Sequence, residues 1–146
     1  MEFMPLQNRP TSVIFSDASG DKGCGVWYKR HLFSHRWSDA QLKWSVPRKE
    51  LYPIWKTLKR FGHQFKNHLV LACTDSSTNV FALCAGSSTS TECNKLLKRI
   101  SRLERLHKCD VIGLWLPREF NIVTDQISKF NLLANPLFTH DHQEPK

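Results

Sequence analysis

The sequence lacks the features that mark a secreted, membrane-spanning or disulfide-bonded protein. No apolar run approaches the roughly 18 residues that a membrane-crossing helix needs, so no membrane partner is expected. The first ten residues, MEFMPLQNRP, do not have the basic-then-apolar profile of a signal peptide. We therefore expect either an intracellular protein, nuclear or cytoplasmic, or a piece of a longer chain. The five cysteines form no CxxC pair, which indicates reduced, mostly buried thiols and disfavours a zinc site.

Acidic residues are scarce relative to basic ones. Thirteen Asp and Glu stand against 21 Lys and Arg, and the formal net charge is +8. A surface this basic favours polyanionic partners, nucleic acid first, although solubility alone is the competing explanation. The 146 residues suffice for one domain with a core. We expect a disordered leader over residues 1–11, a folded domain over 12–135 and a polar tail over 136–146.

Apolar runs and turn residues predict strands and helices in alternation. Three short runs with tight turns, at residues 13–15, 25–28 and 32–37, predict an antiparallel meander. Two more strands are expected at residues 70–74 and 111–116. Helical patterns cover residues 47–65, 76–83 and 122–133, and a capping box at Thr89 and Glu92 opens another. Pro53 predicts a bend or a restart near Tyr52. The order indicates one α/β domain with helices packed on a mixed sheet.

Four carboxylates stand at predicted strand ends or helix starts, namely Asp17, Glu50, Asp75 and Asp125. Such ends converge at one edge of an open sheet. Crowded carboxylates raise one another's pKa, and a divalent cation with hard oxygen ligands, Mg²⁺ or Mn²⁺, removes that conflict. Two such ions can drive phosphodiester hydrolysis. The small residues after Asp17, Ser19 among them, would let a phosphate backbone approach, so the pattern is compatible with a metal-dependent nuclease.

Each carboxylate also has an ordinary local explanation. Asp17 can start a turn, Glu50 can interact with a helix dipole, and Asp75 can cap the helix that follows it. Asp125 alone carries little information. The residues by themselves leave both interpretations open.

Five segments in order resemble the ribonuclease H domain that follows reverse transcriptase in retrotransposons. The similarity is greatest to the version in DIRS-like elements, which encode a tyrosine recombinase. It runs from about Val13 to Lys129, and the matching segments are FSDASGDKGCGVW, RWS, RKELYPIWKTLKRFG, LACTDSSTNVFAL and LPREFNIVTDQISK. The resemblance implies a ribonuclease H-like fold: a mixed five-stranded sheet, with an antiparallel meander of three strands plus two parallel strands, and helices packed on it.

The resemblance also implies an activity and a set of site residues. Asp17, Glu50, Asp75 and Asp125 would bind two Mg²⁺ ions, with Mn²⁺ as a substitute, for hydrolysis of the RNA strand of an RNA–DNA hybrid. Nucleic acid would be contacted by Ser19, Asn79, Lys95, Arg99, Arg102 and Asn121. For the basic residues of the helix after Glu92, a solvated face is the alternative. A reverse transcriptase domain in a parent polyprotein is a further expected partner.

Some positions depart from the family pattern. Trp115 stands where many relatives have histidine, Arg118 stands where glycine is usual, and Thr124 replaces the common alanine. Ser76 follows Asp75 where asparagine is frequent. These departures keep a second function open, a catalytically weak relic that binds nucleic acid. A third is a plain binding module whose acidic residues are caps and turns.

Overall fold

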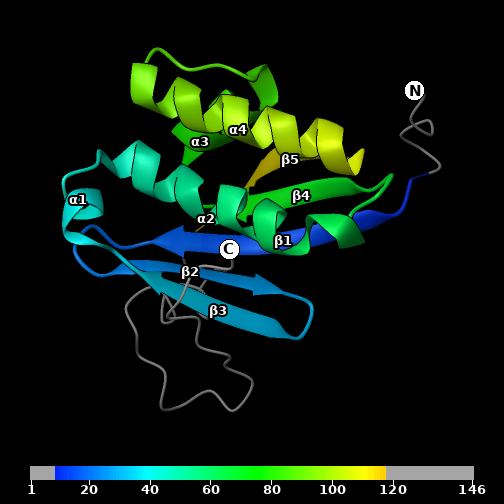
Figure 1. Ribbon diagram of the computed structural model, residues 1–146, viewed down its shortest axis with the longest axis horizontal. Coiled ribbons are helices and arrows are strands. Elements are labelled where there is room, and N and C mark those ends of the chain that lie inside the picture. The colour runs from blue at the N-terminus through cyan, green and yellow to red at the C-terminus, as the bar shows by residue number, and fades with distance from the viewer. Residues whose placement is uncertain (1–8, 118–146) are drawn as a thin grey trace.

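A five-stranded mixed sheet lies at the centre of the molecule, in a computed structural model that describes residues 9–117 (Figure 1). The strands are β1 (Thr11–Ala18), β2 (Gly23–Tyr28), β3 (His31–Arg36), β4 (Leu69–Thr74) and β5 (Asp110–Trp115). Their spatial order is β3-β2-β1-β4-β5. The first three strands form an antiparallel meander, and β4 pairs parallel to both β1 and β5. This arrangement confirms the predicted mixed five-stranded sheet.

The helices connect the later strands and pack on the sheet. They are α1 (Asp39–Leu42), α2 (Val46–Phe61), the 3-10 helix η2 (Gly62–Gln64), α3 (Ser77–Ala85) and α4 (Thr91–His107). Helix α2 contacts β1 and β2 on one side and α4 on the other, while α3 packs against β5. Figure 1 shows α4 alongside α2, with β4 and β5 beside α4 and β1 beside α2. The start of α2 therefore lies where a side chain can reach the sheet.

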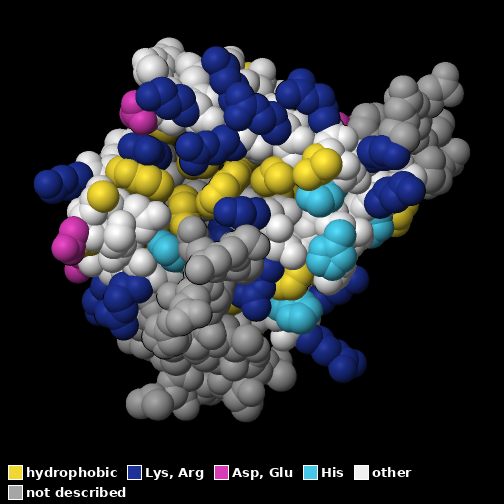
Figure 2. Space-filling model, in the orientation of Figure 1, with side chains coloured by type: hydrophobic (Ala, Val, Ile, Leu, Met, Phe, Trp, Pro, Cys, Tyr) yellow, Lys and Arg dark blue, Asp and Glu magenta, His cyan; other side chains and the backbone are white. Residues whose placement is uncertain are grey.

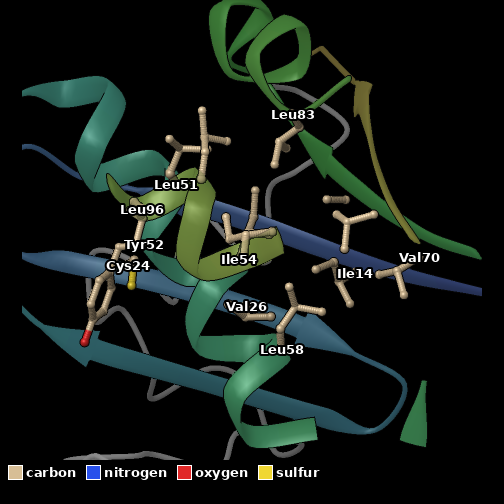
Figure 3. Packing of buried hydrophobic residues seen from close by; sticks show 14 of the residues in the cluster. Ile14, Cys24, Val26, Leu51, Tyr52, Ile54, Leu58, Val70, Leu83 and Leu96 are labelled. Atoms are coloured by element: carbon tan, nitrogen blue, oxygen red, sulfur yellow. The ribbon is translucent and has the colours of Figure 1, made fainter. Parts of the chain in front are cut away.

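Alternating apolar residues of the strands build the core against α2. Ile14, Val26 and Val70 are fully buried, and each points to the same face of the sheet (Figure 3). Ile54 and Leu58 of α2 lie over this face and are also fully buried. Burying a side chain of this size contributes about 1.5–3 kcal/mol, so this layer holds α2 in place.

Three local expectations are corrected by the structure. Of the bend or restart expected at Pro53, the restart is absent, because α2 runs unbroken from Val46 to Phe61 with Pro53 buried inside it. Helix α4 is capped by Ser90, not Thr89, since the Ser90 side chain accepts a hydrogen bond from the backbone N–H of Cys93 at 3.3 Å. Residues 9–11, assigned to the leader, belong to the folded part, and Arg9 is buried and pairs with Asp110.

The remaining expectations on the architecture have mixed outcomes. Four of the five cysteines are buried, Cys84 is exposed, and all five are free thiols, as predicted. Within residues 9–117, none of the helices has the length and apolar character needed to cross a membrane. The predicted final helix over residues 122–133 and the polar tail lie outside the described residues.

Candidate active site

Asp17 lies within β1 and does not start the turn. It pairs with Gly25 of β2 and is 8% exposed. The turn begins later, where the Ser19 hydroxyl accepts hydrogen bonds from the backbone N–H groups of Lys22 (3.1 Å) and Gly23 (2.9 Å). The structure therefore does not support the turn explanation for Asp17. Ser19, one of the predicted nucleic-acid contacts, is buried and uses its hydroxyl inside this turn.

Asp75 follows the last residue of β4 directly. The parallel register pairs Phe15 of β1 with Cys73 of β4. Because the two strands run parallel, Asp17 near the end of β1 and Asp75 just after β4 lie at the same end of the sheet. Asp75 is not the helix cap, because Ser76 is the N-cap of α3 and accepts from the N–H of Asn79 at 3.3 Å.

Glu50 lies on α2 and approaches the end of β4 from that helix. It is not a first-turn charge, because α2 begins at Val46 and its first turn holds no acidic residue. One carboxylate oxygen, Oε2, accepts a hydrogen bond from Asn79 Nδ2 of α3 at 3.2 Å. The same amide nitrogen lies 3.2 Å from the carbonyl oxygen of Pro47. Asn79 is 1% exposed, so it holds Glu50 from inside the protein.

The electrostatics of Glu50 reflect its position. Burial raises the pKa of the Glu50 carboxyl above its ordinary value of 4.5. A hydrogen bond from the Ser76 side chain lowers that pKa, and the charge of Asp75 raises it again. The effect of Asp75 shows that the two carboxyl groups are close enough to repel. Glu50 of α2 therefore lies near Asp75, and Asp17 lies at the same end of the neighbouring parallel strand β1.

The donor chemistry of this edge suits a hard divalent cation, since the candidate ligands are carboxylate oxygens. Among residues 9–117, however, no three His, Cys, Asp or Glu side chains are grouped so that they could hold a metal ion. The fourth predicted ligand, Asp125, lies outside the described residues, as does Asn121. The described carboxylates thus fit a cation by chemistry and do not form a complete metal site by themselves.

The predicted basic contacts lie on a different surface. Lys95, Arg99 and Arg102 are exposed on α4, which packs against α2. Figure 2 shows Lys and Arg side chains over α4 and α2, with a band of hydrophobic side chains between them. We call Lys95, Lys98, Arg99, Arg102 and Arg105 the α4 basic face; all five are exposed. Lys95 pairs with Glu92 at 3.2 Å, and the Arg99 guanidinium lies 6.0 Å from the ring centroid of Trp55.

Aromatic side chains adjoin this face at the start of α2. The Arg48 guanidinium lies 3.8 Å from the ring centroid of Trp44, and it pairs with Glu92 at 3.5 Å. Trp44, Arg48, Lys95 and Arg99 line one small depression between α2 and α4. Arg48 was not predicted as a site residue. The one sequence feature that could have pointed to it is its position two residues before Glu50.

Comparison with known proteins identifies the architecture. No family model matches the chain, and no curated protein matches it by sequence. Its structure is similar to that of RNase H1 from Halobacterium salinarum, with 11% identity, a TM-score of 0.60 and coverage of 85% of this chain and 99% of that one. The chain has the ribonuclease H fold.

Two further solved structures share the ribonuclease H fold. The N-terminal RNase H domain of a Mycobacterium tuberculosis protein is 14% identical with a TM-score of 0.58, covering 82% of this chain and 97% of that one. The compost-derived LC11 RNase H1, solved in complex with an RNA/DNA hybrid, is 16% identical with a TM-score of 0.57, and the match covers 80% of this chain and 92% of that one. At these identities the likeness establishes the fold of this chain.

Proposed function

We propose that this chain is a divalent-metal-dependent endonuclease that hydrolyses the RNA strand of RNA–DNA hybrids. The observation that carries the proposal is that Glu50 of α2 is bound by Asn79 of α3, the helix that begins two residues after Asp75, while Asp17 lies at the same end of the parallel neighbour β1. Neighbouring carboxylates repel one another, and a bound divalent cation offsets that repulsion. The ribonuclease H fold of the chain, and a neighbour of this fold that was solved with an RNA/DNA hybrid, support the substrate class.

Asp17, Glu50, Asp75 and Asp125 would hold Mg²⁺, with Mn²⁺ as a substitute, and two ions are proposed. When bound, such a cation supplies an activated water and offsets negative charge on the phosphodiester. Asn79 and Ser76 orient the Glu50 carboxylate through their hydrogen bonds to it. Removing a residue that orients a metal ligand in this way typically changes metal affinity or activity by about 10–100-fold.

The α4 basic face is proposed to contact the phosphate backbone of the hybrid. Recognition of an A-form-like duplex relies on phosphates and 2′-hydroxyl groups more than on base edges, so exposed cations without base specificity suffice. Asn121 is proposed as a further contact, and Ser19, whose hydroxyl is used inside its turn, as one of the small residues that let the backbone approach. For Asn79 the described geometry favours the support of Glu50, since its side chain is buried.

The proposal is tested by incubating purified protein with a labelled RNA–DNA hybrid in Mg²⁺ and in EDTA. We expect RNA-strand cleavage in Mg²⁺ that disappears in EDTA and in Asp75→Asn. Asp39→Asn, which changes an exposed aspartate of α1, is the matched control and should cleave like the wild type. Single-stranded RNA and duplex DNA should remain intact. Cleavage that persists in EDTA or in Asp75→Asn would contradict the proposal.

A catalytically weak protein that binds hybrids is the second candidate. It is favoured by Trp115 at the end of β5, which is 50% exposed and stands where the family pattern has histidine. Hybrid binding without cleavage at every Mg²⁺ and Mn²⁺ concentration would select it. In either case we propose an origin in a reverse-transcribing mobile element, with a reverse transcriptase domain in the parent polyprotein and an intracellular, nuclear or cytoplasmic location.

A further inference from the structure

Lys49 is a buried lysine beside the candidate active site. It precedes Glu50 in α2, and the residue is only 5% exposed. Its ammonium donates hydrogen bonds to two backbone carbonyls, those of Gly20 at 2.5 Å and Leu42 at 3.0 Å. Lysine is rarely buried unless its charge is paired or hydrogen-bonded, because an unsatisfied ammonium is costly in the interior. The two carbonyls provide that compensation here.

The two carbonyls belong to separate parts of the chain. Gly20 lies in the turn between β1 and β2, three residues after Asp17. Leu42 is the last residue of α1, just before the helix that carries Glu50. The Lys49 ammonium is therefore a three-way link between the end of β1, the end of α1 and the first turn of α2.

Other contacts hold the same turn from a different side. The indole Nε1–H of Trp37 donates to the carbonyl of Ser19 at 2.8 Å, and the Trp37 backbone N–H donates to that of Lys22 at 2.9 Å. These bonds attach the turn to the end of β3, and Trp37 itself packs against Tyr52 of α2 with the ring centroids 5.7 Å apart. The hydrogen bonds of Lys49 supply a direct link between the turn and α2.

We infer that Lys49 is a positioning residue that fixes the spacing between Asp17 on β1 and Glu50 on α2. The inference rests on the proposed function, because it assigns importance to the spacing of these two carboxylates. Lys49 acts through the backbone of the turn and not on the substrate, so its loss should slow the chemical step and leave hybrid affinity unchanged. A carboxylate pair that drifts apart loses geometry that catalysis depends on.

The test uses the full chain with Lys49→Met, which keeps the length of the side chain and removes the charge. We expect kcat on the hybrid to fall by about tenfold or more, as for other residues that orient metal ligands, with KM within about twofold of wild type. Lys49→Arg, which keeps the donors, should recover part of kcat. Lys66→Met removes an exposed lysine outside this edge and should leave both constants unchanged.

A second readout does not depend on activity. Amide hydrogen exchange at Ser19 and Gly23, whose N–H groups bond within the turn, should be faster in Lys49→Met than in wild type or Lys66→Met. If the wild type does not cleave hybrids, the proposed function fails while this measurement still reports on the link. Unchanged exchange, or a change in KM alone, would overturn the inference. If Lys49→Met does not fold, the same measurements on Lys49→Gln decide.

Discussion

Asn79 connects two elements of the site through a single amide. Its Nδ2 group donates to Glu50 Oε2, and the residue is almost completely enclosed. In Asn79→Ala the Glu50 carboxylate loses this hydrogen-bond donor, so the carboxylate is no longer held in one orientation. We expect kcat on the hybrid to fall by about 10–100-fold. Steady-state kinetics at saturating Mg²⁺ measures the effect.

The control for that substitution is Asn94→Ala. Asn94 uses its amide oxygen and its amide nitrogen in bonds to the backbone of Ser88, and it lies on α4. It should lose stability without a comparable loss of kcat. Equal losses of kcat in both variants would mean that Asn79 acts through stability alone.

Glu104 on α4 provides a pH-dependent test of stability. Burial raises the pKa of the Glu104 carboxyl above its ordinary value of 4.5, and the negative charge of Asp110 raises it further. The hydrogen bond from the Val111 N–H and the positive charge of Arg105 lower this pKa but do not cancel the rise. The folded state therefore holds the proton more tightly than the unfolded state. The contribution of Glu104 to the free energy of unfolding therefore falls as pH rises from 4.5 through the raised folded pKa.

The expected result for Glu104→Gln is a stability gain over wild type that grows with pH. Glutamine keeps an oxygen that can accept from the Val111 N–H and has no proton to lose. Urea unfolding of both proteins between about pH 4 and pH 7 measures the gap. Asp21→Asn, at an exposed position, is the control. A gap that stays constant across this range would contradict the raised pKa.

At the residue scale, the sequence predicts which carboxylates matter better than it predicts what supports them. Asp17, Glu50 and Asp75 were identifiable because each stands at the end of an apolar run or near the start of a helical one. The supporting roles of Lys49 and Asn79 could not be predicted, because the burial of a lysine or an asparagine depends on which distant segments of the chain pack against it. Asn79 was predicted to face nucleic acid, whereas its side chain is turned inward.

Among the elements, α4 offers a test of where a helix begins. The sequence pattern favours Thr89 as the cap, while the structure has Ser90 accepting from the N–H of Cys93. Ser90→Ala should lower the free energy of unfolding by about 1 kcal/mol, because one N–H of the first turn loses its acceptor. Thr89→Ala should have little effect. Chemical denaturation of both variants measures the difference, and the opposite order would contradict the assigned cap.

The packing of α3 on β5 depends on Gly113. A Cβ atom at this position would lie 2.8 Å from the Cα of Val80 in α3, which is backbone and cannot move independently. Gly113→Ala should therefore push α3 from the sheet and cost about 1–3 kcal/mol of stability. Gly20→Ala is the control, since a Cβ there meets nothing within 4 Å. Thermal or urea unfolding that ranks the two variants equally would contradict this packing.

Element types follow from periodicity, and element details follow from packing. The five strands were predicted because each is a short apolar run bounded by turn residues. Helix α1 was missed because its four residues are too short to show a period, although Ser38 and Gln41 form a capping box. The continuity of α2 through Pro53 depends on tertiary contacts that no local rule includes.

For the whole molecule, the charge distribution predicts a strong salt dependence of binding. Lys95, Arg99 and Arg102 are exposed together on the α4 basic face. If they bind phosphates, changing all three to glutamine should reduce the slope of log K against log salt by about 0.9 for each phosphate that is no longer neutralised. Fluorescence anisotropy with a labelled hybrid in EDTA measures the slope without cleavage.

The matched control changes three exposed cations elsewhere, Lys29, Arg30 and Lys66. The net charge changes equally in both triple variants, so only the location of the charge differs. The control should keep a slope close to that of wild type. Equal reductions in both variants would mean that binding responds to net charge and that the α4 basic face is not the contact surface.

The central position of the first strand has a consequence for the order in which the chain is made. β1 has β2 on one side almost at once, whereas its other side is completed by β4, with Thr11 paired to Leu69. A nascent chain that has not reached Leu69 exposes one row of unpaired N–H and C=O groups along β1. Such an edge is a template for pairing with another chain. During synthesis, self-association is therefore a greater hazard before β4 emerges than after it.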